Sequence, residues 1–297
     1  MFHLLSGVVR GSLSLALYIL NTLFWCIPLF MLVLAKAAVP LESWMRRCSR
    51  MLNAVAENWI WVNNQNQKLV VGNTRWDVQG VETLKRSEWY LVLANHQSWV
   101  DILVLQRIFH RKIPFLMFFI KKEMIWLPVL GQAWWAMDFP FVKRYSQSYL
   151  QKKPHLRGKD LEITRKACRK FKKIPVSIMN FVEGTRFTDE KHRRQQSPYV
   201  HLLKPKAGGI AFVLGSMGEQ IQRVLDVTIV YPDGAKNFWA LLCGKIRWIK
   251  VRVRSLPVSP ELRGDYTNDR HFRAELQGWL NNIWAEKNRC IQEMMTS

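Results

Sequence analysis

Residues 92–105 read VLANHQSWVDILVL, and this stretch decides which kind of fold the chain can adopt. It continues an apolar run at 89–94, which is typical of a buried strand, and then passes through a short polar turn. From 101 to 109 apolar residues recur on nearly every turn, which predicts a helix. A strand, a polar turn and a helix in this order are where open α/β sheets place their functional sites.

The polar turn carries an Asn-His pair, and Asp101 follows His96 by five positions. A histidine oriented by a carboxylate can take the proton of a hydroxyl group, which suits acyl transfer to an alcohol. The bare spacing is weak evidence, because His155 and Asp160 repeat it. That second pair lies in KKPHLRGKDLE, where charge, proline and glycine indicate a loop. We therefore expect His96, and not His155, to be catalytic.

The composition narrows the class of partner. Lysine and arginine number 44 against 22 aspartate and glutamate residues, a net charge of +22 that favours nucleic acid, acidic lipid headgroups or phosphorylated substrates. Fourteen tryptophans favour the membrane among these, since tryptophan prefers the bilayer interface. Five cysteines without C-x-x-C spacing predict free thiols in a reducing compartment. We expect neither a disulfide framework nor a metal site.

Residues 11–35 form a charge-free apolar stretch between Arg10 and Lys36. About twenty apolar residues cross a bilayer core, so a transmembrane helix is favoured. A signal peptide is disfavoured, because the stretch is too long and has no clear small-residue cleavage site. Asn21 and Pro28 keep a kinked or re-entrant helix, inserted from one side, as an alternative.

Arginines just after this stretch predict its orientation. Arg46, Arg47 and Arg50 outnumber the lone Arg10, which places the following domain on the cytoplasmic side. Residues 40–62 carry apolar side chains at helical spacing with these arginines on other faces, as in an amphipathic helix. This helix lies either at the membrane interface or against the main domain.

Strands and helices alternate beyond this point, which predicts a layered α/β domain over 71–297 after membrane-anchoring helices at 1–70. The polar, turn-rich segment 72–80 marks its start. Strands are expected at 89–94, 135–142, 176–182, 225–231 and 247–254, the last as an edge strand with a charged outer face. Helices are expected at 101–109, from 121, at 159–173 and from 269, and a polar loop at 189–206.

A second polar cluster, Glu183-Gly184-Thr185-Arg186, ends another apolar run and is suited to an anionic substrate. The guanidinium of Arg186 can bind a phosphate through two hydrogen bonds, and Gly184 lets the backbone approach closely. Glu183 can bind a hydroxyl group or brace Arg186. The chain has no G-x-S-x-G, Walker A, G-x-G-x-x-G or H-E-x-x-H motif, so the chemistries that depend on these motifs are set aside.

Four blocks together resemble a known family. NHQSWVD at 95–101, FVKR at 141–144, FVEGTR at 181–186 and TIVYP at 228–232 stand in the order of the four motifs of the glycerophospholipid acyltransferases. The chain is thus similar to the 1-acylglycerol-3-phosphate O-acyltransferase (PlsC-like) family over roughly 75–260, and it looks most like a bacterial inner-membrane branch. One departure is Val182, which stands where many members have proline.

The resemblance implies a function and a site. His96 would deprotonate the sn-2 hydroxyl of a lysophospholipid, Asp101 would orient the imidazole, and an acyl-CoA or acyl-carrier-protein thioester would be the donor, without a cofactor. Lysophosphatidic acid is the leading acceptor, followed by lysocardiolipin or lysophosphatidylglycerol. The domain would face the cytoplasm at the inner membrane of a bacterium. The residues implied in acceptor binding are Glu183, Gly184, Thr185 and Arg186, with Lys143 and Arg144 as a second phosphate contact.

Two other classes of protein compete with an enzyme. A basic membrane protein that binds nucleic acid would explain the charge, but the aromatic residues lie in apolar runs and are not interleaved with basic ones. We therefore expect no specific nucleic acid. A non-catalytic membrane scaffold is disfavoured because both polar clusters are intact. The expected partners are the lysophospholipid, the acyl donor and anionic membrane lipids.

Overall fold

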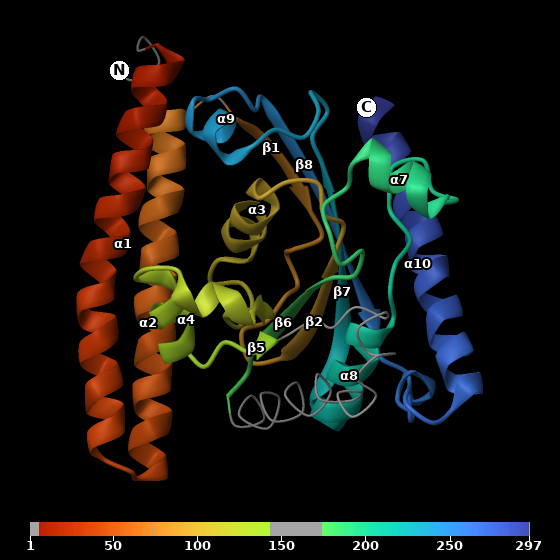
Figure 1. Ribbon diagram of the computed structural model, residues 1–297, viewed down its shortest axis with the longest axis horizontal. Coiled ribbons are helices and arrows are strands. Elements are labelled where there is room, and N and C mark those ends of the chain that lie inside the picture. The colour runs from red at the N-terminus through yellow and green to blue at the C-terminus, as the bar shows by residue number, and fades with distance from the viewer. Residues whose placement is uncertain (1–5, 73, 143–173, 297) are drawn as a thin grey trace.

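The computed structural model of the chain describes residues 6–72, 74–142 and 174–296. Its main strands are β1 Arg75–Gln79, β2 Trp89–Ala94, β3 Leu116–Phe118, β6 Ser177–Phe181, β7 Ile221–Val230 and β8 Trp248–Pro257. They form one sheet in the order β1-β8-β7-β2-β6-β3, with helices on both faces (Figure 1). β8 runs antiparallel to β7, whereas β7, β2, β6 and β3 are parallel. The expected layered α/β fold is confirmed.

The central strand β2 is covered on both faces of the sheet. Helices α3 Val100–Phe109 and α9 Phe238–Leu242 lie on one face, and α8 Gly208–Met217 and α10 Arg270–Thr296 lie on the other (Figure 1). Leu91 and Leu93 belong to one core cluster, and Tyr90 and Val92 to the other. Burial on both faces explains why the strand is apolar throughout and does not alternate.

The first two helices form an antiparallel hairpin beside the sheet (Figure 1). They are α1 Gly7–Ala38 and α2 Glu42–Asn66, and a π-helical turn, Gln67–Val71, follows. Asn21 Nδ2 donates to Asn63 Oδ1 at 2.9 Å, which joins the helices through buried polar groups. In the described part of the chain, α1 is the helix long and apolar enough to cross a membrane. Helix α2 contacts both α1 and α3, and its buried residues lie between Cys48 and Asn66.

Both ends of α1 are fastened to the rest of the domain. Near its start, the buried Arg10 side chain donates to the carbonyl oxygens of Cys243 at 3.2 Å and Val71 at 3.4 Å. Near its end, Lys36 Nζ forms an ion pair with Asp138 at 2.8 Å. The hairpin is therefore bonded at both ends to the α/β part of the chain.

The expectation of an edge strand at 247–254 was wrong. The segment 72–80, expected to be turn-rich, contains β1, which pairs with β8 and makes it an interior strand. The charged side chains of β8 have partners: Lys250 Nζ donates to Met294 O at 3.0 Å, and Arg252 pairs with Asp77 at 2.7 Å. The alternating charged residues predicted a strand face exposed to solvent. In the structure, residues of α10 and β1 instead pair with the charged side chains of Lys250 and Arg252.

Two other sequence expectations were wrong. Residues 130–136 form helix α4 Leu130–Ala136, so only β5 Phe141–Val142 remains of the strand expected at 135–142; it pairs with β4 Ile120–Lys121. The loop expected at 189–206 begins with helix α7 Asp189–Gln195, capped by Thr188 Oγ1, which accepts from Lys191 N at 3.3 Å. Short 3₁₀ helices lie at Lys122–Trp126, Gly218–Gln220 and Pro260–Leu262. The expected helix at 159–173 lies outside the described residues, as does His155.

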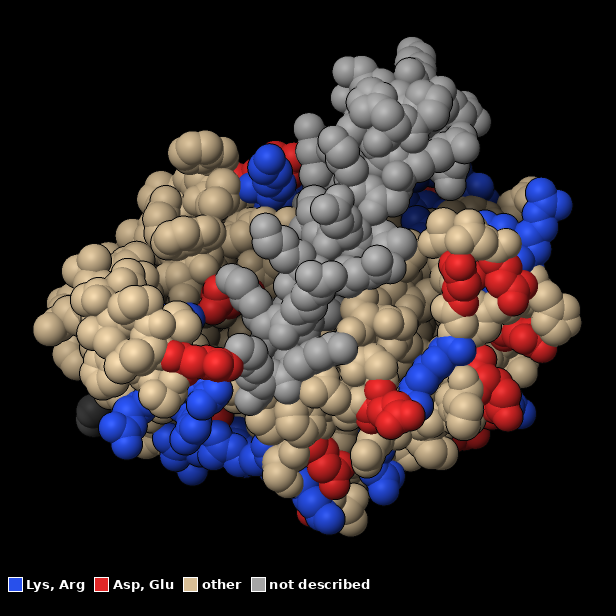
Figure 2. Space-filling view, turned by 90° about the horizontal axis from the view of Figure 1, so that it is seen from below, with Lys and Arg blue, Asp and Glu red and all other residues tan. Residues whose placement is uncertain are grey.

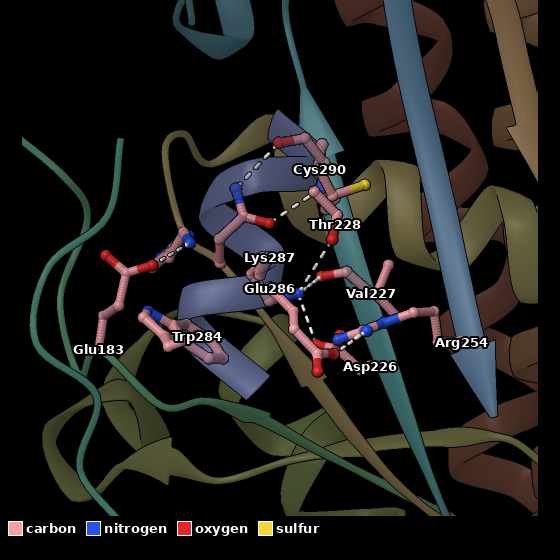
Figure 3. A network of polar contacts seen from close by, with 12 residues as sticks. Glu183, Asp226, Val227, Thr228, Arg254, Trp284, Glu286, Lys287 and Cys290 are labelled. Carbon is pink, nitrogen blue, oxygen red and sulfur yellow. Dashed lines mark hydrogen bonds and ion pairs between the residues drawn. The ribbon is translucent and has the colours of Figure 1, made fainter. Parts of the chain in front are cut away.

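The C-terminal helix α10 covers the face of the sheet opposite α3. The helical spacing of Phe272, Leu276, Trp279 and Ile283 predicts that they face the core; Phe272, Leu276 and Ile283 are buried, and Trp279 is partly buried against the same core cluster. Lys287 is also fully buried, and it lies against β7 in a polar network with Asp226 and Arg254 (Figure 3). This buried cation was not anticipated from the sequence.

The charge excess of the chain is spread unevenly. In the view of Figure 2, lysine and arginine side chains gather along one edge, whereas the opposite end carries acidic side chains among the basic ones. Clustered positive charge raises the local concentration of anions more than the same charge dispersed. This edge is therefore suited to an anionic surface or ligand.

Candidate active site

The expected catalytic pair lies at the carboxyl end of β2. His96 follows the strand by two positions, and Asp101 lies in the first turn of α3. His96 Nδ1 is 2.9 Å from Asp101 Oδ2, and the Asp101 side chain is fully buried. Because a carboxylate only accepts hydrogen bonds, Nδ1 carries the proton and Nε2 keeps its lone pair. A general base requires this tautomer.

Asp101 is held by four hydrogen bonds. Besides His96, the backbone N–H groups of Gln97 and Ser98 donate to Oδ2 at 2.6 and 2.9 Å. The hydroxyl of Tyr231 donates to Oδ1 at 2.6 Å. These donors compensate the burial of a carboxylate, which is costly when it is left without partners.

Two residues that sequence reasoning did not single out fix the position of His96. The Asn95 side chain accepts from Ile229 N at 2.8 Å and donates to Ile229 O at 2.9 Å, which joins the end of β2 to β7. The ring of Phe181 stacks on the imidazole, with centroids 3.9 Å apart and planes 15° apart. Asn95 lies in the block NHQSWVD and Phe181 in the block FVEGTR. The position of each residue within its block was therefore the sequence signal that could have identified it.

The second cluster closes a tight turn beside His96. Gly184 has a φ of 72°, a conformation that favours glycine, and its N–H donates to Phe181 O at 2.9 Å. Phe187 N donates to His96 O at 2.7 Å, so the turn is bonded to the loop that carries His96. Val182 is buried and its carbonyl accepts from Lys206 N at 2.9 Å. The turn thus forms with valine at the position where many members of the similar family have proline.

Glu183 lies beneath the site. Its carboxyl oxygens accept from the backbone N–H of His96 at 3.1 Å and of Leu203 at 3.2 Å, and its side chain is fully buried. Burial raises the pKa of Glu183 from its usual 4.5 to about 8, against the two N–H groups, which lower it. The sequence suggested a contact with a substrate hydroxyl or with Arg186. In the structure the carboxyl group of Glu183 instead accepts from two backbone N–H groups, and the bond from His96 N holds the loop that carries His96.

Arg186 is exposed at the rim of the site. Its guanidinium lies over the ring of Trp99, with Cζ 5.1 Å from the ring centroid. Lys191, from α7, donates through Nζ to Thr185 Oγ1 and to Arg186 O, each at 2.9 Å. The stacked guanidinium is positioned and keeps its planar donor edge available for an anion. Trp99 and Lys191 were not anticipated.

A cavity of about 600 Å³ begins at these residues and extends to the N-terminal hairpin. Its polar end is formed by His96, Gly184, Thr185 and Arg186. Its walls are mostly apolar and come from α1, α2, α3, α4 and the segment around β3 and β4. Their apolar residues include Trp25, Leu29, Trp59, Ile60, Leu103, Phe118, Trp134 and Phe139, and polar side chains of Thr22, Gln106, Lys121 and Asn180 also line the cavity. A mostly apolar cavity with a few convergent polar groups is typical of a ligand site. Its composition suits a long hydrocarbon chain with a polar head.

The remaining site expectations concern Lys143, Arg144 and metals. Lys143 and Arg144 lie outside the described residues. Among the residues that the structure describes, no group of three His, Cys, Asp or Glu side chains is placed to hold a metal ion.

Comparison with known proteins gives relatives over the same region. The chain is 25% identical over 186 residues to 1-acyl-sn-glycerol-3-phosphate acyltransferase gamma of Mus musculus, covering 59% of this chain and 44% of the relative. It is 28% identical over 130 residues to lysocardiolipin acyltransferase 1 of Danio rerio, covering 40% of this chain and 31% of the relative. The chain thus spans less than half the length of these relatives.

A solved structure shows the same fold. The crystal structure of the 1-acyl-sn-glycerophosphate (LPA) acyltransferase PlsC from Thermotoga maritima aligns with a TM-score of 0.53 at 16% identity, covering 97% of this chain and 98% of the other. The model of the family described as Acyltransferase matches residues 75–231, which is more than half of the chain. This region contains both halves of the candidate site. The chain therefore belongs to the acyltransferase family.

Proposed function

We propose that this enzyme transfers a fatty acyl group from a thioester to the sn-2 hydroxyl of 1-acylglycerol 3-phosphate, which gives phosphatidic acid. One observation carries the proposal: His96, which is paired with the buried Asp101, and Arg186 line the same mostly apolar cavity. A phosphorylated lipid alcohol needs a general base for its hydroxyl group, a cation for its phosphate and an apolar space for its hydrocarbon chain. The names of the relatives support this choice of acceptor.

In the proposed reaction His96 is the general base. Its Nε2 takes the proton of the sn-2 hydroxyl as the oxygen attacks the thioester carbonyl, so that a C–O bond forms and the C–S bond breaks. The proton then passes to the departing thiolate, which regenerates neutral His96. Asp101 keeps Nδ1 protonated and stabilises the imidazolium while it exists. A donor of either kind, acyl-CoA or acyl carrier protein, supplies the same thioester.

Arg186 is proposed to bind the acceptor phosphate, with Lys143 and Arg144 as a second contact. Replacing Arg186 with alanine is expected to raise KM for lysophosphatidic acid on the order of tenfold or more, because a charge-assisted hydrogen bond to the phosphate is lost. The effect on monoacylglycerol, which lacks the phosphate, should be small. Radiolabelled acceptors with a long-chain acyl-CoA, in membranes from overproducing cells, measure both values.

Arg193→Ala is the matched control, since this arginine is also exposed and lies on α7. It should leave the preference for the phosphorylated acceptor unchanged. Equal KM for lysophosphatidic acid in wild type and Arg186→Ala would contradict the phosphate role. Absence of acyl transfer by wild type to every lysophospholipid, from both acyl-CoA and acyl-carrier-protein donors, would contradict the function itself.

A second acceptor is favoured by one relative. Because a lysocardiolipin acyltransferase is among the similar proteins, lysocardiolipin is the alternative, with lysophosphatidylglycerol of the same kind. These acceptors carry a phosphodiester, so the same base and cation would serve. Turnover of one of them in preference to lysophosphatidic acid would keep the mechanism and change the product.

We further propose that the hairpin, as residues 1–70, anchors a catalytic domain at 71–297 to one leaflet of a bacterial inner membrane, on the cytoplasmic side. The outer face of α1 is apolar and exposed at Ile19, Leu20, Leu23, Phe24, Ile27, Met31 and Leu34. A helix of 32 residues is about 48 Å long and exceeds the ~30 Å hydrocarbon core. With Arg10 and Lys36 both bonded to the domain, a full crossing would draw charged surface into the bilayer.

Cysteine labelling tests this arrangement. Cysteines placed at Ser6, before α1, and at Ser43, after it, should react with a membrane-impermeant maleimide in inside-out vesicles and stay unlabelled in spheroplasts. A cysteine at Arg193 marks the side of the catalytic domain, and mass spectrometry identifies the labelled peptide. Labelling of Ser6→Cys in spheroplasts would show that α1 crosses the membrane.

A further inference from the structure

Tyr231 lies one residue beyond β7, at the edge of the sheet where the parallel strand β2 delivers His96. Its hydroxyl donates to Asp101 Oδ1 at 2.6 Å, and both side chains are buried. The other Asp101 oxygen receives the imidazole and two backbone N–H groups. The carboxylate is therefore bonded on two sides, by the catalytic loop and by Tyr231.

We infer that Tyr231 is a positioning residue for catalysis, whose hydroxyl holds Asp101 in the orientation that presents Oδ2 to His96. This inference rests on the proposed function, since it assigns a role within the same site. Tyr231 does not line the cavity that contains His96 and Arg186. It therefore acts through Asp101 and is not placed to touch a substrate.

The geometry explains why the hydroxyl is needed. Within the described part of the chain, Tyr231 is the donor that reaches Oδ1, whereas Oδ2 has three donors. A buried carboxylate oxygen without a donor is destabilised, which favours rotation of the group. Rotation weakens the alignment of Asp101 with the imidazole. Asp101 would then stabilise the imidazolium less, so His96 would take up a proton only at lower pH than in wild type.

Tyr231 is suited to donate under all working conditions. Burial raises the pKa of Tyr231 well above its ordinary value of 10, and the neighbouring Asp101 carboxylate raises it further. The hydroxyl therefore keeps its proton. The ring itself belongs to the core cluster that also contains Val100 and Val104 of α3, so the aromatic ring has a packing role separate from the hydroxyl.

Tyr231→Phe separates the two roles, because phenylalanine keeps the ring and removes the donor. We expect kcat for acyl transfer to fall on the order of tenfold, with KM for acceptor and donor unchanged. The acid limb of the pH profile of kcat should move to lower pH, because a misaligned Asp101 stabilises the imidazolium of His96 less. A variant with the kcat and the acid limb of wild type would overturn the inference, whatever its melting temperature.

Tyr90→Phe is the matched control. Tyr90 is also buried and belongs to the same core cluster, but its hydroxyl donates to Glu88 and accepts from Lys85 N, away from the dyad. Tyr90→Phe should lower stability without moving the acid limb.

A double-mutant cycle with Asp101→Asn tests whether Tyr231 acts through Asp101. If it does, Tyr231→Phe should lower kcat much less in the Asp101→Asn background than in wild type. Equal effects in both backgrounds would point to packing alone.

A measurement without substrate separates this inference from the proposed function. Diethyl pyrocarbonate modifies neutral imidazole, and peptide mass spectrometry gives the rate at His96 as a function of pH in the full-length protein. The midpoint should fall in Tyr231→Phe, because a misaligned Asp101 stabilises the imidazolium less, and stay unchanged in Tyr90→Phe. Identical midpoints in all three proteins would overturn the inference. If the midpoint moved but wild type acylated no lysophospholipid, only the proposed function would fall.

Discussion

Replacing His96 with alanine is expected to lower kcat by about 10²- to 10⁴-fold, the usual contribution of a positioned general base. The imidazole is the group whose Nδ1 is bonded to buried Asp101 and whose ring faces the polar end of the cavity. KM for the acceptor should change little, because Arg186 and the apolar walls remain. Product formation from labelled lysophosphatidic acid, at matched protein abundance, measures the effect.

His271→Ala is a suitable control for this prediction. The His271 side chain, on α10, is 82% exposed. Among the described residues its ion-pair partner is Glu275 of the same helix. It should retain the activity of wild type. Asp101→Asn, which removes the carboxylate that sets the tautomer, should also lose activity by a similar factor. A folded His96→Ala protein with the kcat of wild type would exclude the imidazole as the base.

Replacing Lys287 with methionine is expected to reduce the free energy of unfolding by about 3–5 kcal/mol, the cost of breaking a buried ion pair from one side. Lys287 Nζ lies 2.6 Å from Asp226 Oδ1 and donates to Val227 O at 2.5 Å and Thr228 Oγ1 at 3.3 Å (Figure 3). Burial lowers the pKa of Lys287, and the Asp226 carboxylate opposes that shift. Without the ammonium group, Asp226 keeps only Arg254 as its cation in the described structure, at 2.7 Å.

Urea unfolding in mild detergent measures this loss, with Arg289→Met as the control. Arg289 is exposed on the same helix, so its removal should change stability by less than about 0.5 kcal/mol. The double variant Asp226→Asn/Lys287→Met should recover part of the loss, because it leaves no uncompensated buried carboxylate. An unfolding midpoint of Lys287→Met equal to that of wild type would show that the pair is not needed to dock α10.

Much of the central architecture was predictable from the sequence. The run at 89–94 and the helical pattern at 101–109 correspond to β2 and α3 within one residue. Such segments are predictable because burial on both faces of a strand and on one face of a helix imposes a local apolar pattern. The same reasoning failed for β8, whose charged residues are satisfied by α10 and by neighbouring strands.

The site was predictable in part. The sequence placed His96 and Asp101 five positions apart, and the turn between strand and helix brings their side chains together. It could not show that Glu183 bonds the His96 backbone, or that Tyr231, 130 positions after Asp101, donates to its second oxygen. These contacts depend on the order of strands, which no local pattern encodes.

The sequence by itself determined the chemistry available to this protein: a histidine and a carboxylate after a buried strand, an arginine after another, a long apolar N-terminal helix and a basic surface. Only the tertiary structure decided how these parts combine. Pairing β2 with both β6 and β7 brings His96, Glu183 and Tyr231 to one edge of the sheet. Packing the hairpin beside α3 extends the cavity from His96 to α1. The physical reason is that local patterns fix which face of an element is buried, whereas its neighbours are chosen by packing of the whole chain.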